Sequence, residues 1–405
     1  MPPESLTAPQ PVVAPPAARL PLVVYVLALG TFLMLTTEFV VAGILAEISG
    51  SLSISLAEAG SLITVFAVGM VIGAPIMALL TMRMSKKLTL VFALAVFVMG
   101  HVVVVLGSHL GLLMGARFVT AIATGAFWAV SAVVASQAAG ESMASRAVGV
   151  VGAGGSLATV LGVPIGAFVA QHVGWRGTFW ALAVAGVVAM VFVARLVPAD
   201  ERVERRESSV LAELADLRSR GLWLVLAACV ATTGGILAFY SYITPVLTQQ
   251  AGIDAALVPL VLTAYGIGSL IGTLVGGRLG DAHPHLVTIV TPAVTVVIMI
   301  ALAAVTGSAW TTIAFVVLLG LFGLSANGVL IHLAVRFAGR AATLGSGLCV
   351  AAFNAGTAVG TAVVGGLLTG PLGLSGPATV GAIGVAIVLI PTIALAAVRR
   401  REARV

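Results

Sequence analysis

Charged residues are scarce in this 405-residue sequence: only 8% are Asp, Glu, Lys or Arg, whereas 60% are hydrophobic. Soluble globular domains carry about 25% charged residues, so this chain lacks the polar surface that keeps a protein dispersed in water. The mean hydropathy of +1.18 points the same way. The scarcity of charge therefore excludes an ordinary soluble protein and predicts one whose solvent is the lipid bilayer.

Cysteine is also rare. Cys229 and Cys349 both fall inside apolar runs and match no metal-ligand or redox spacing, so we interpret them as small buried hydrophobic residues. The sequence lacks a phosphate-binding glycine loop, a cluster of metal ligands, and a nucleophile beside a paired base. We therefore expect no cofactor and no metal, and an ion gradient or the substrate's own gradient as the source of energy.

Basic residues outnumber acidic ones, 20 to 14, but they form no stripe with interleaved aromatic residues. Such a stripe is typical of proteins that follow nucleic-acid phosphates, so we expect no nucleic-acid partner. The basic residues instead occupy short loops between apolar runs. That distribution is how membrane proteins encode their orientation.

Long apolar runs fill most of the chain. A helix needs about 20 mostly apolar residues to cross the hydrocarbon core. The runs that satisfy this requirement number twelve: 22–46, 59–81, 88–107, 110–136, 147–171, 177–197, 221–247, 257–279, 286–305, 309–335, 343–369 and 376–398. The sequence thus predicts an all-α membrane protein with twelve transmembrane helices.

The basic residues also predict which way these spans face. With both termini in the cytoplasm, 18 of the 20 basic residues lie in cytoplasmic segments, while Arg176 lies outside and Arg117 within a span. Cytoplasmic loops carry an excess of Lys and Arg, so this orientation is strongly favoured. We expect a multi-pass membrane protein with both termini in the cytoplasm. The first residues, rich in Pro and Ala, lack the basic start of a signal peptide and are expected to form a disordered cytoplasmic tail.

A long charged connection separates the first six spans from the last six. Gly69 and Gly73 in the second span match Gly268 and Gly272 in the eighth at a common offset of 199 residues. Each glycine pair alone indicates close helix packing, but the loops that follow share the same offset. We therefore predict two pseudo-symmetric six-helix bundles with a substrate site between them. The predicted segments are a tail at 1–20, bundles at 21–197 and 221–398, a cytoplasmic linker at 198–220, and a basic tail at 399–405.

One acid and one strong base lie inside the predicted hydrocarbon region. Glu38 lies just past the middle of the first span, and Arg117 lies in the outer half of the fourth. Ionisable groups are costly there and usually functional. Because the two lie at similar depth, we predict that they face one cavity, where Glu38 binds and releases a proton as the cavity opens to each side. The alternative is a static buried pair that only orients two helices.

Other side chains in the spans are candidates for lining the same cavity, although each is equally explained as a contact between helices. These are Phe39, Thr124, Trp128, Thr233, Tyr240, Asn327 and Asn354. His101 and His332 also lie in or near spans, and we interpret both as hydrogen-bonded packing residues rather than proton relays.

The chain resembles the twelve-span drug:proton antiporters of the major facilitator superfamily, and among them the chloramphenicol exporters of actinobacteria. The likeness rests on Thr37-Glu38-Phe39, on Arg117 with Gly125, and on Gly162-Val163-Pro164-Ile165-Gly166. It extends from residue 20 to 398 and includes Gly73-Ala74-Pro75, Arg83, Lys86-Lys87, Gly174-Trp175-Arg176 and Gly276-Gly277-Arg278-Leu279-Gly280-Asp281.

This resemblance implies roles by position. Arg117 matches an arginine tied to proton coupling in the family. The glycines and proline of the fifth span, Gly162, Pro164 and Gly166, match a bend motif that distinguishes antiporters from uptake symporters, which favours export. The remaining matches are to segments that change conformation: Gly73, Pro75, Arg83 and Asp281.

The sequence departs from the family pattern at several places: Met82 replaces an acid, Ala282 a basic residue and Ala121 a glycine, and Val163 separates Gly162 from Pro164. The missing charge in the first loop weakens the expectation that this loop gates as it does in the wider family.

Taken together, the residues and the resemblance predict proton-coupled export of small, largely apolar drugs, chloramphenicol or related antibiotics, by a monomer in the bacterial inner membrane. A sister branch with the same Glu-Phe signature suggests sugar or nucleoside export instead. The few polar residues in the spans favour an apolar substrate. A membrane-embedded enzyme is the third possibility, and the lack of a catalytic cluster counts against it.

Overall fold

The computed structural model describes residues 20–81, 84–140, 143–198, 219–304, 308–339 and 342–402. Several predicted features lie outside the described residues, namely the tail at 1–19, Arg83, most of the linker at 199–218 and the last residues of the basic tail, 403–405.

Helices are the only regular elements in the described segments, and twelve of the helical stretches are long and apolar enough to cross a membrane. The number of spans predicted from the sequence is therefore confirmed. The first six comprise α1 (Leu22–Gly43), α3 (Leu56–Thr81), α4 (Lys86–Leu106), α5 (Leu110–Ala139), α6 (Ala144–Leu157) continued by η1 (Ala158–Gly162) and α7 (Val163–Val173), and α8 (Trp175–Leu196). The last six comprise α10 (Arg220–Tyr240), α12 (Val258–Ala282), α13 (Pro284–Ala304), α14 (Ala309–Gly323) with α15 (Asn327–Phe337), α16 (Ala342–Leu367) and α17 (Gly376–Glu402).

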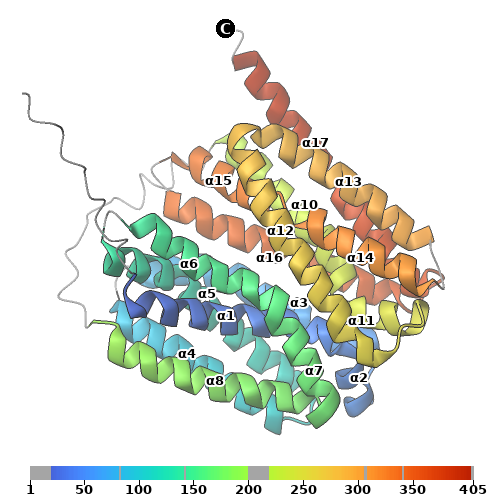
Figure 1. The fold of residues 1–405 in the computed structure, drawn as a ribbon, viewed down its shortest axis with the longest axis horizontal. Coiled ribbons are helices and arrows are strands. Elements are labelled where there is room, and N and C mark those ends of the chain that lie inside the picture. The colour runs from blue at the N-terminus through green and yellow to red at the C-terminus, as the bar shows by residue number, and fades with distance from the viewer. Residues whose placement is uncertain are drawn as a thin grey trace, which may run out of the picture.

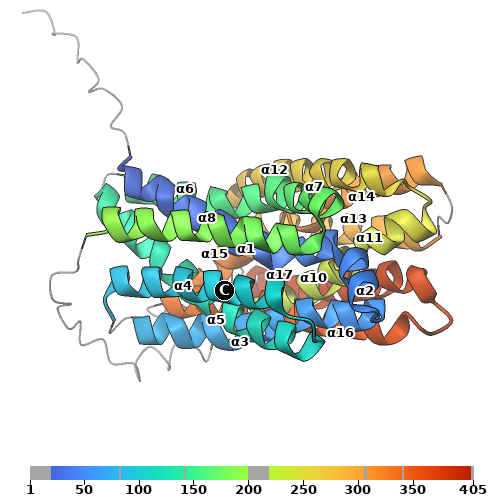
Figure 2. The same ribbon diagram turned by 90° about the horizontal axis from the view of Figure 1, so that it is seen from below.

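Short elements connect some of the spans. They are α2 (Leu45–Leu52), α11 (Ile243–Pro245), η2 (Val246–Gln250), η3 (Ala255–Leu257) and η5 (Gly373–Ser375). In both views α2 and α11 lie at the same end of the bundle, which we name the α2 end (Figures 1 and 2).

Proline accounts for some of the places where the observed helices differ from the predicted runs. The run at 221–247 is not one helix, because α10 ends at Tyr240 and a new turn begins at Ile243. Pro245 lacks an N–H group and its ring clashes with the carbonyl four residues earlier, at Ser241, where the helix breaks. The fifth span stays continuous across Pro164, but its preceding turn widens into the π-helix η1.

The two halves of the chain pack their helices in the same way. A side chain at Gly69 on α3 would come within 2.8 Å of the Phe118 carbonyl oxygen on α5. The repeat-related Gly268 on α12 lies equally close, 2.8 Å, to the Val317 carbonyl oxygen on α14. Residues 118 and 317 are themselves separated by the repeat offset. The structure thus has two pseudo-symmetric bundles, drawn in blue to green and in yellow to red in Figure 1.

The bundles meet along two seams. In one, α3 of the first half packs along α16 of the second, and in the other α7 and η1 pack against α12. The hydrogen bonds that join the halves in the described residues lie at the α2 end: Gln171 donates to the Ala255 carbonyl at 2.6 Å, and Thr244 donates to the Ala42 carbonyl at 2.9 Å. The halves are therefore fastened to each other at that end of the protein.

Candidate functional site

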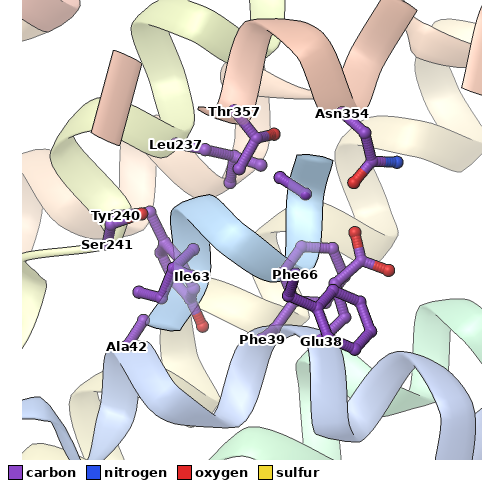
Figure 3. Close-up of a pocket in the computed structure, with 11 residues that line it drawn as sticks. Glu38, Phe39, Ala42, Ile63, Phe66, Leu237, Tyr240, Ser241, Asn354 and Thr357 are labelled. Carbon is purple, nitrogen blue, oxygen red and sulfur yellow. The ribbon is translucent and has the colours of Figure 1, made fainter. Parts of the chain in front are cut away.

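A pocket lies between the two halves, where α1 and α3 face α10 and α16. Most of its wall is apolar or aromatic. Its lining residues are Glu38, Phe39, Ala42, Ile63, Phe66, Ala67, Leu237, Tyr240, Ser241, Asn354 and Thr357 (Figure 3).

Glu38 is the one carboxylate in the wall of this pocket. It is half-buried, and its side chain extends from α1 into the same part of the pocket that Asn354 approaches from α16 (Figure 3). Residues 38 and 39 lie on the same side of α1 as residue 42 because they precede it by four and three positions on a helix with 3.6 residues per turn. Thr37 and Val41 lie on the opposite side and are fully buried.

Arg117 approaches Glu38 from α5, and the structure brings the predicted pair together. Its Nη1 donates to the carbonyl and hydroxyl oxygens of Thr37, at 2.7 and 3.0 Å, and its Nη2 donates to the carbonyl oxygen of Glu38 at 3.5 Å. The guanidinium carbon lies 4.2 Å from the centre of the Phe66 ring, within range of a cation–π contact. Arg117 is 2% exposed and its Nε has no hydrogen-bond partner.

The second half presents polar atoms that lack partners inside the protein. Asn354 donates its amide N–H to the carbonyl oxygen of Val350 at 3.1 Å. Because a carbonyl only accepts, this bond fixes the amide so that Oδ1 points elsewhere, and that oxygen is buried without a partner. The hydroxyl of Tyr240 is also buried and unpartnered, while its ring lies against that of Tyr265 with centroids 4.8 Å apart. Buried polar atoms are almost always hydrogen-bonded, so both atoms are suited to a bound molecule.

Three of the predicted cavity residues, Phe39, Tyr240 and Asn354, line this pocket, and four others do not. Thr124 is buried and its hydroxyl bonds the Thr120 carbonyl of its own helix at 2.9 Å. Thr233 binds the Phe353 carbonyl and so joins α10 to α16.

The other two lie elsewhere. Trp128 packs beside Gly155, with its ring 3.6 Å from where a Cβ would lie at that glycine, between α5 and α6. Asn327 begins α15, away from the lining residues, and its Oδ1 is buried without a partner.

The glycines implied by the resemblance lie where helices approach closely. A side chain at Gly162 would collide with Thr36, and one at Gly166 with Val40, so the fifth span is pressed against α1 around Glu38. Gly73 lies 2.7 Å, measured from a hypothetical Cβ, from the Ile122 backbone of α5. The other conformational candidates lie within helices: Pro75 in α3, Pro164 in α7 and Asp281 near the end of α12.

The sequence did not single out Phe66, Ser241 or Thr357, which also line the pocket. Thr357 follows Asn354 by three residues, so both lie on one face of α16, and that spacing is the signal that could have identified it. His101 was predicted to be a hydrogen-bonded packing residue, and its Nε2 lies 2.8 Å from the hydroxyl oxygen of Thr37.

Metal binding finds no support in the described part of the chain, which holds no group of three or more His, Cys, Asp or Glu side chains that could bind an ion. Cys229 and Cys349 are both buried and reduced, with their sulfur atoms 3.2 Å apart between α10 and α16.

Comparison with known proteins agrees with this architecture. The family model of the Major Facilitator Superfamily matches residues 27–254 and 224–405. The putative transporter AraJ of Escherichia coli is 34% identical over 87% of this chain and 89% of its own length. A chloramphenicol resistance protein of Streptomyces lividans is 30% identical over 92% of this chain and 95% of its own.

Solved structures share the fold at low sequence identity. The nucleoside transporter NupG superposes with a TM-score of 0.74 at 12% identity, over 94% of this chain and 99% of its own. A bacterial homologue of the lysosomal transporter Spinster, inward-facing and occupied, gives a TM-score of 0.72 at 16% identity, over 94% of this chain and 96% of its own. With its twelve spans in two related bundles and a pocket between them, the chain belongs to the major facilitator superfamily of membrane transporters.

Proposed function

We propose that this protein exports small, largely apolar drug-like molecules from a bacterial cell in exchange for protons. The observation that carries the proposal is the position of Glu38: a single carboxylate in an otherwise uncharged pocket between the halves, with Arg117 fixed to the backbone beside it. Ionisable groups are retained inside a membrane when they handle ions or substrates.

The pocket wall supports an apolar, aromatic-bearing substrate. Phe39 and Phe66 supply ring surfaces, and Ile63 and Leu237 supply aliphatic ones. Hydrophobic lining with a few fixed polar groups is typical of sites for small molecules. A sugar site would need many more hydroxyl and amide groups, so the alternative of sugar or nucleoside export is weaker, and the likeness to NupG bears on the fold alone. The likeness to a chloramphenicol resistance protein favours amphenicols as the first substrates to test.

Proton coupling follows from alternating access. If the halves can rock only when Glu38 is protonated or when a drug is bound beside it, each cycle exchanges a proton for a drug molecule. The distribution of basic residues favours cytoplasmic termini, and in that orientation the α2 end, with its bonds between the halves, faces outward. In this state the halves are held together on the outer side, so a substrate enters the pocket from the cytoplasm. The protein acts as a monomer. The bundles at 21–197 and 221–398 are the moving units, with 198–220 as connector.

The experiment is drug-induced proton release from purified protein in liposomes. Wild type should release protons when chloramphenicol is added and should drive its export against a gradient. Glu38→Gln keeps the size and hydrogen bonding of the side chain but cannot change charge, so uphill export should stop while drug binding and downhill exchange persist. Exchange of protons for drug by Glu38→Gln at the wild-type rate would assign the coupling to another residue. A panel of antibiotics tested on a susceptible host that expresses the gene would define the substrates.

A further inference from the structure

His101 on α4 is a buried titratable residue that the proposed mechanism leaves unused. It is 2% exposed and lies outside the pocket wall. Its ring lies between those of Phe97, with centroids 4.1 Å apart, and Phe179 of α8, at 5.6 Å. Gly100, whose Cβ would collide with the Thr120 hydroxyl, lets α4 approach α5 closely. The imidazole is thereby held in one place and shielded from water.

The hydrogen bonds of His101 show which of its two ring nitrogens donates and which accepts. Its Nδ1 lies 2.6 Å from the carbonyl oxygen of Phe97. A carbonyl only accepts, so Nδ1 carries the hydrogen and donates. In a neutral imidazole the other nitrogen, Nε2, is then an acceptor, and it lies 2.8 Å from the hydroxyl oxygen of Thr37. The Thr37 hydroxyl therefore donates to His101.

Arg117 completes the chain of bonds. It has only donors, and its Nη1 lies 3.0 Å from the same Thr37 hydroxyl oxygen. A hydroxyl has one hydrogen and two lone pairs. Because the Thr37 hydroxyl donates its hydrogen to a bond with His101, its lone pairs can accept from Arg117. A protonated His101 would instead place a second buried cation against the oxygen that Arg117 of α5 already contacts, while α8 presents the uncharged ring of Phe179 to it.

Other buried threonines show what Thr37 does without such a partner. Thr31, Thr120 and Thr232 each donate to the carbonyl oxygen four residues earlier, at 3.0, 2.7 and 2.7 Å. Threonine hydroxyls within helices commonly donate to the carbonyl oxygen four residues earlier in this way. The Thr37 hydroxyl departs from this pattern and crosses to α4, because His101 offers a stronger acceptor.

We propose that His101 is a positioning residue for proton coupling: its neutral imidazole holds the Thr37 hydroxyl so that the hydroxyl oxygen anchors Arg117 beside Glu38. Without His101 the Thr37 side chain rotates to bond the carbonyl of Leu33, as Thr31 bonds that of Leu27. The rotation moves its oxygen away from Arg117, which keeps backbone acceptors alone. Arg117 then loses its fixed relation to Glu38, while the pocket wall is unchanged. This role rests on the proposed proton-coupled transport.

Two substitutions at His101 separate its two hydrogen bonds. His101→Asn keeps a donor for the Phe97 carbonyl, as Asn354 does for Val350, but cannot reach Thr37. His101→Gln reaches Thr37 with an acceptor oxygen. We expect His101→Asn to lower the maximal rate of gradient-driven export about tenfold, the equivalent of about 1.4 kcal/mol, with the drug Kd and downhill exchange unchanged. His101→Gln should retain most of the wild-type rate.

Thr37 provides the matched test. Thr37→Val should reproduce the loss, Thr37→Ser should restore the rate, and the double variant with His101→Asn should be no slower than either single one. The control is Thr120→Val, which removes a buried hydroxyl at the same seam that bonds only its own helix. Additive losses, equal effects of Asn and Gln at His101, or a loss in Thr120→Val of the same size would overturn the proposal.

A spectroscopic measurement tests the hydrogen bonds without relying on transport. In protein labelled with ¹⁵N-histidine, His101 should give the signal of a neutral Nδ1–H tautomer, identified by its absence in His101→Asn. Thr37→Val should shift the Nε2 signal of His101. If wild type exports drug without protons, the proposed function fails, but the hydrogen bond from Thr37 to His101 is still tested by the spectrum. An Nε2–H tautomer, or no shift in Thr37→Val, would refute that bond.

Discussion

Arg117 donates a hydrogen bond to the backbone oxygen of Glu38, at 3.5 Å, and its other bonds go to Thr37 rather than to the Glu38 carboxylate. The arginine is therefore anchored to the backbone of α1 whatever the charge on Glu38. The carboxylate stays free to face the pocket, where it can bind a proton or a drug. A fixed cation beside a free acid is better suited to repeated protonation than a direct ion pair, which each cycle would have to break.

This geometry predicts that Arg117→Lys is not conservative. The guanidinium uses two nitrogens on three oxygens, whereas an ammonium is a single point charge that cannot span them. Hydrogen bonds to charged groups contribute about 1.5–3 kcal/mol each, so losing one should slow gradient-driven export about tenfold or more. The measurement is initial uptake into inverted vesicles with an imposed pH gradient. Wild-type rates in a correctly inserted Arg117→Lys variant would show that transport does not need the guanidinium to bond these three oxygens at once.

The unpartnered Oδ1 of Asn354 and hydroxyl of Tyr240 predict that removing them weakens substrate affinity but does not lower stability. Tyr240→Phe removes a buried hydroxyl that has no partner inside the protein, and Asn354→Leu removes an unpartnered Oδ1 together with one N–H bond to a carbonyl of its own helix. The Tm of the empty transporter should therefore change little or rise. If a substrate satisfies these atoms, each variant should weaken its Kd several-fold to about tenfold. Asn327→Leu is the control, since its Oδ1 is also buried and unpartnered but lies away from the pocket. Equal losses of affinity in all three variants would argue against direct contact.

Glu47 predicts a pH dependence of stability. It lies on α2 outside the spans, and burial raises its pKa above the usual range of a glutamate, partly offset by a hydrogen bond from its own backbone. A raised pKa in the folded state means that the fold favours the neutral carboxyl. Its contribution to stability is then complete below the pKa of the unfolded chain, about 4.3, and is lost as the pH rises through the folded-state pKa.

The measurement is the Tm in detergent from about pH 4 to pH 8, a range that brackets the glutamate titration. Wild type should lose Tm relative to Glu47→Gln as the pH rises, because the variant has no charge to bury there. A difference in Tm between the two proteins that stays constant across this range would contradict the effect.

The bond between the halves predicts a reversible lock. Thr244 on α11 donates to the Ala42 carbonyl on α1, so cysteines at these two positions should cross-link when the α2 end is fastened. The substitutions Ala42→Cys and Thr244→Cys belong in a background where Cys229 and Cys349 are alanine. Oxidation should stop transport and a reductant should restore it, whereas either single cysteine should transport in both conditions. Undiminished transport by the cross-linked protein would mean that this contact persists through the cycle.

Much of the architecture could be predicted because membrane burial leaves a strong pattern in sequence. Each span needs a long apolar run, and the fold requires its glycines wherever backbones touch, as at Gly69 and Gly268. Glu38 and Arg117 could also be identified as a pair, since charge within such runs is rare. Helix breaks such as that after Tyr240 were missed, because a proline inside an apolar run leaves the hydropathy unchanged.

The details of the site depend on which faces of different helices meet, and one sequence carries little of that information. Thr124 and Asn354 look alike as polar residues in spans, yet Thr124 bonds its own helix and Asn354 lines the pocket. The role of Thr37 depends on His101, sixty-four residues away in the chain and on another helix. No local pattern reports a hydrogen bond of that kind.

The pseudo-symmetry of the halves ends at the pocket. The repeat offset pairs Glu38 with Leu237, and both line the pocket wall from corresponding helices, α1 and α10. A transmembrane voltage does work only on charge, about 2.3 kcal/mol per elementary charge per 100 mV. In the pocket that charge belongs to the first half, so voltage pulls on one bundle and reaches the other only through the surfaces where they pack.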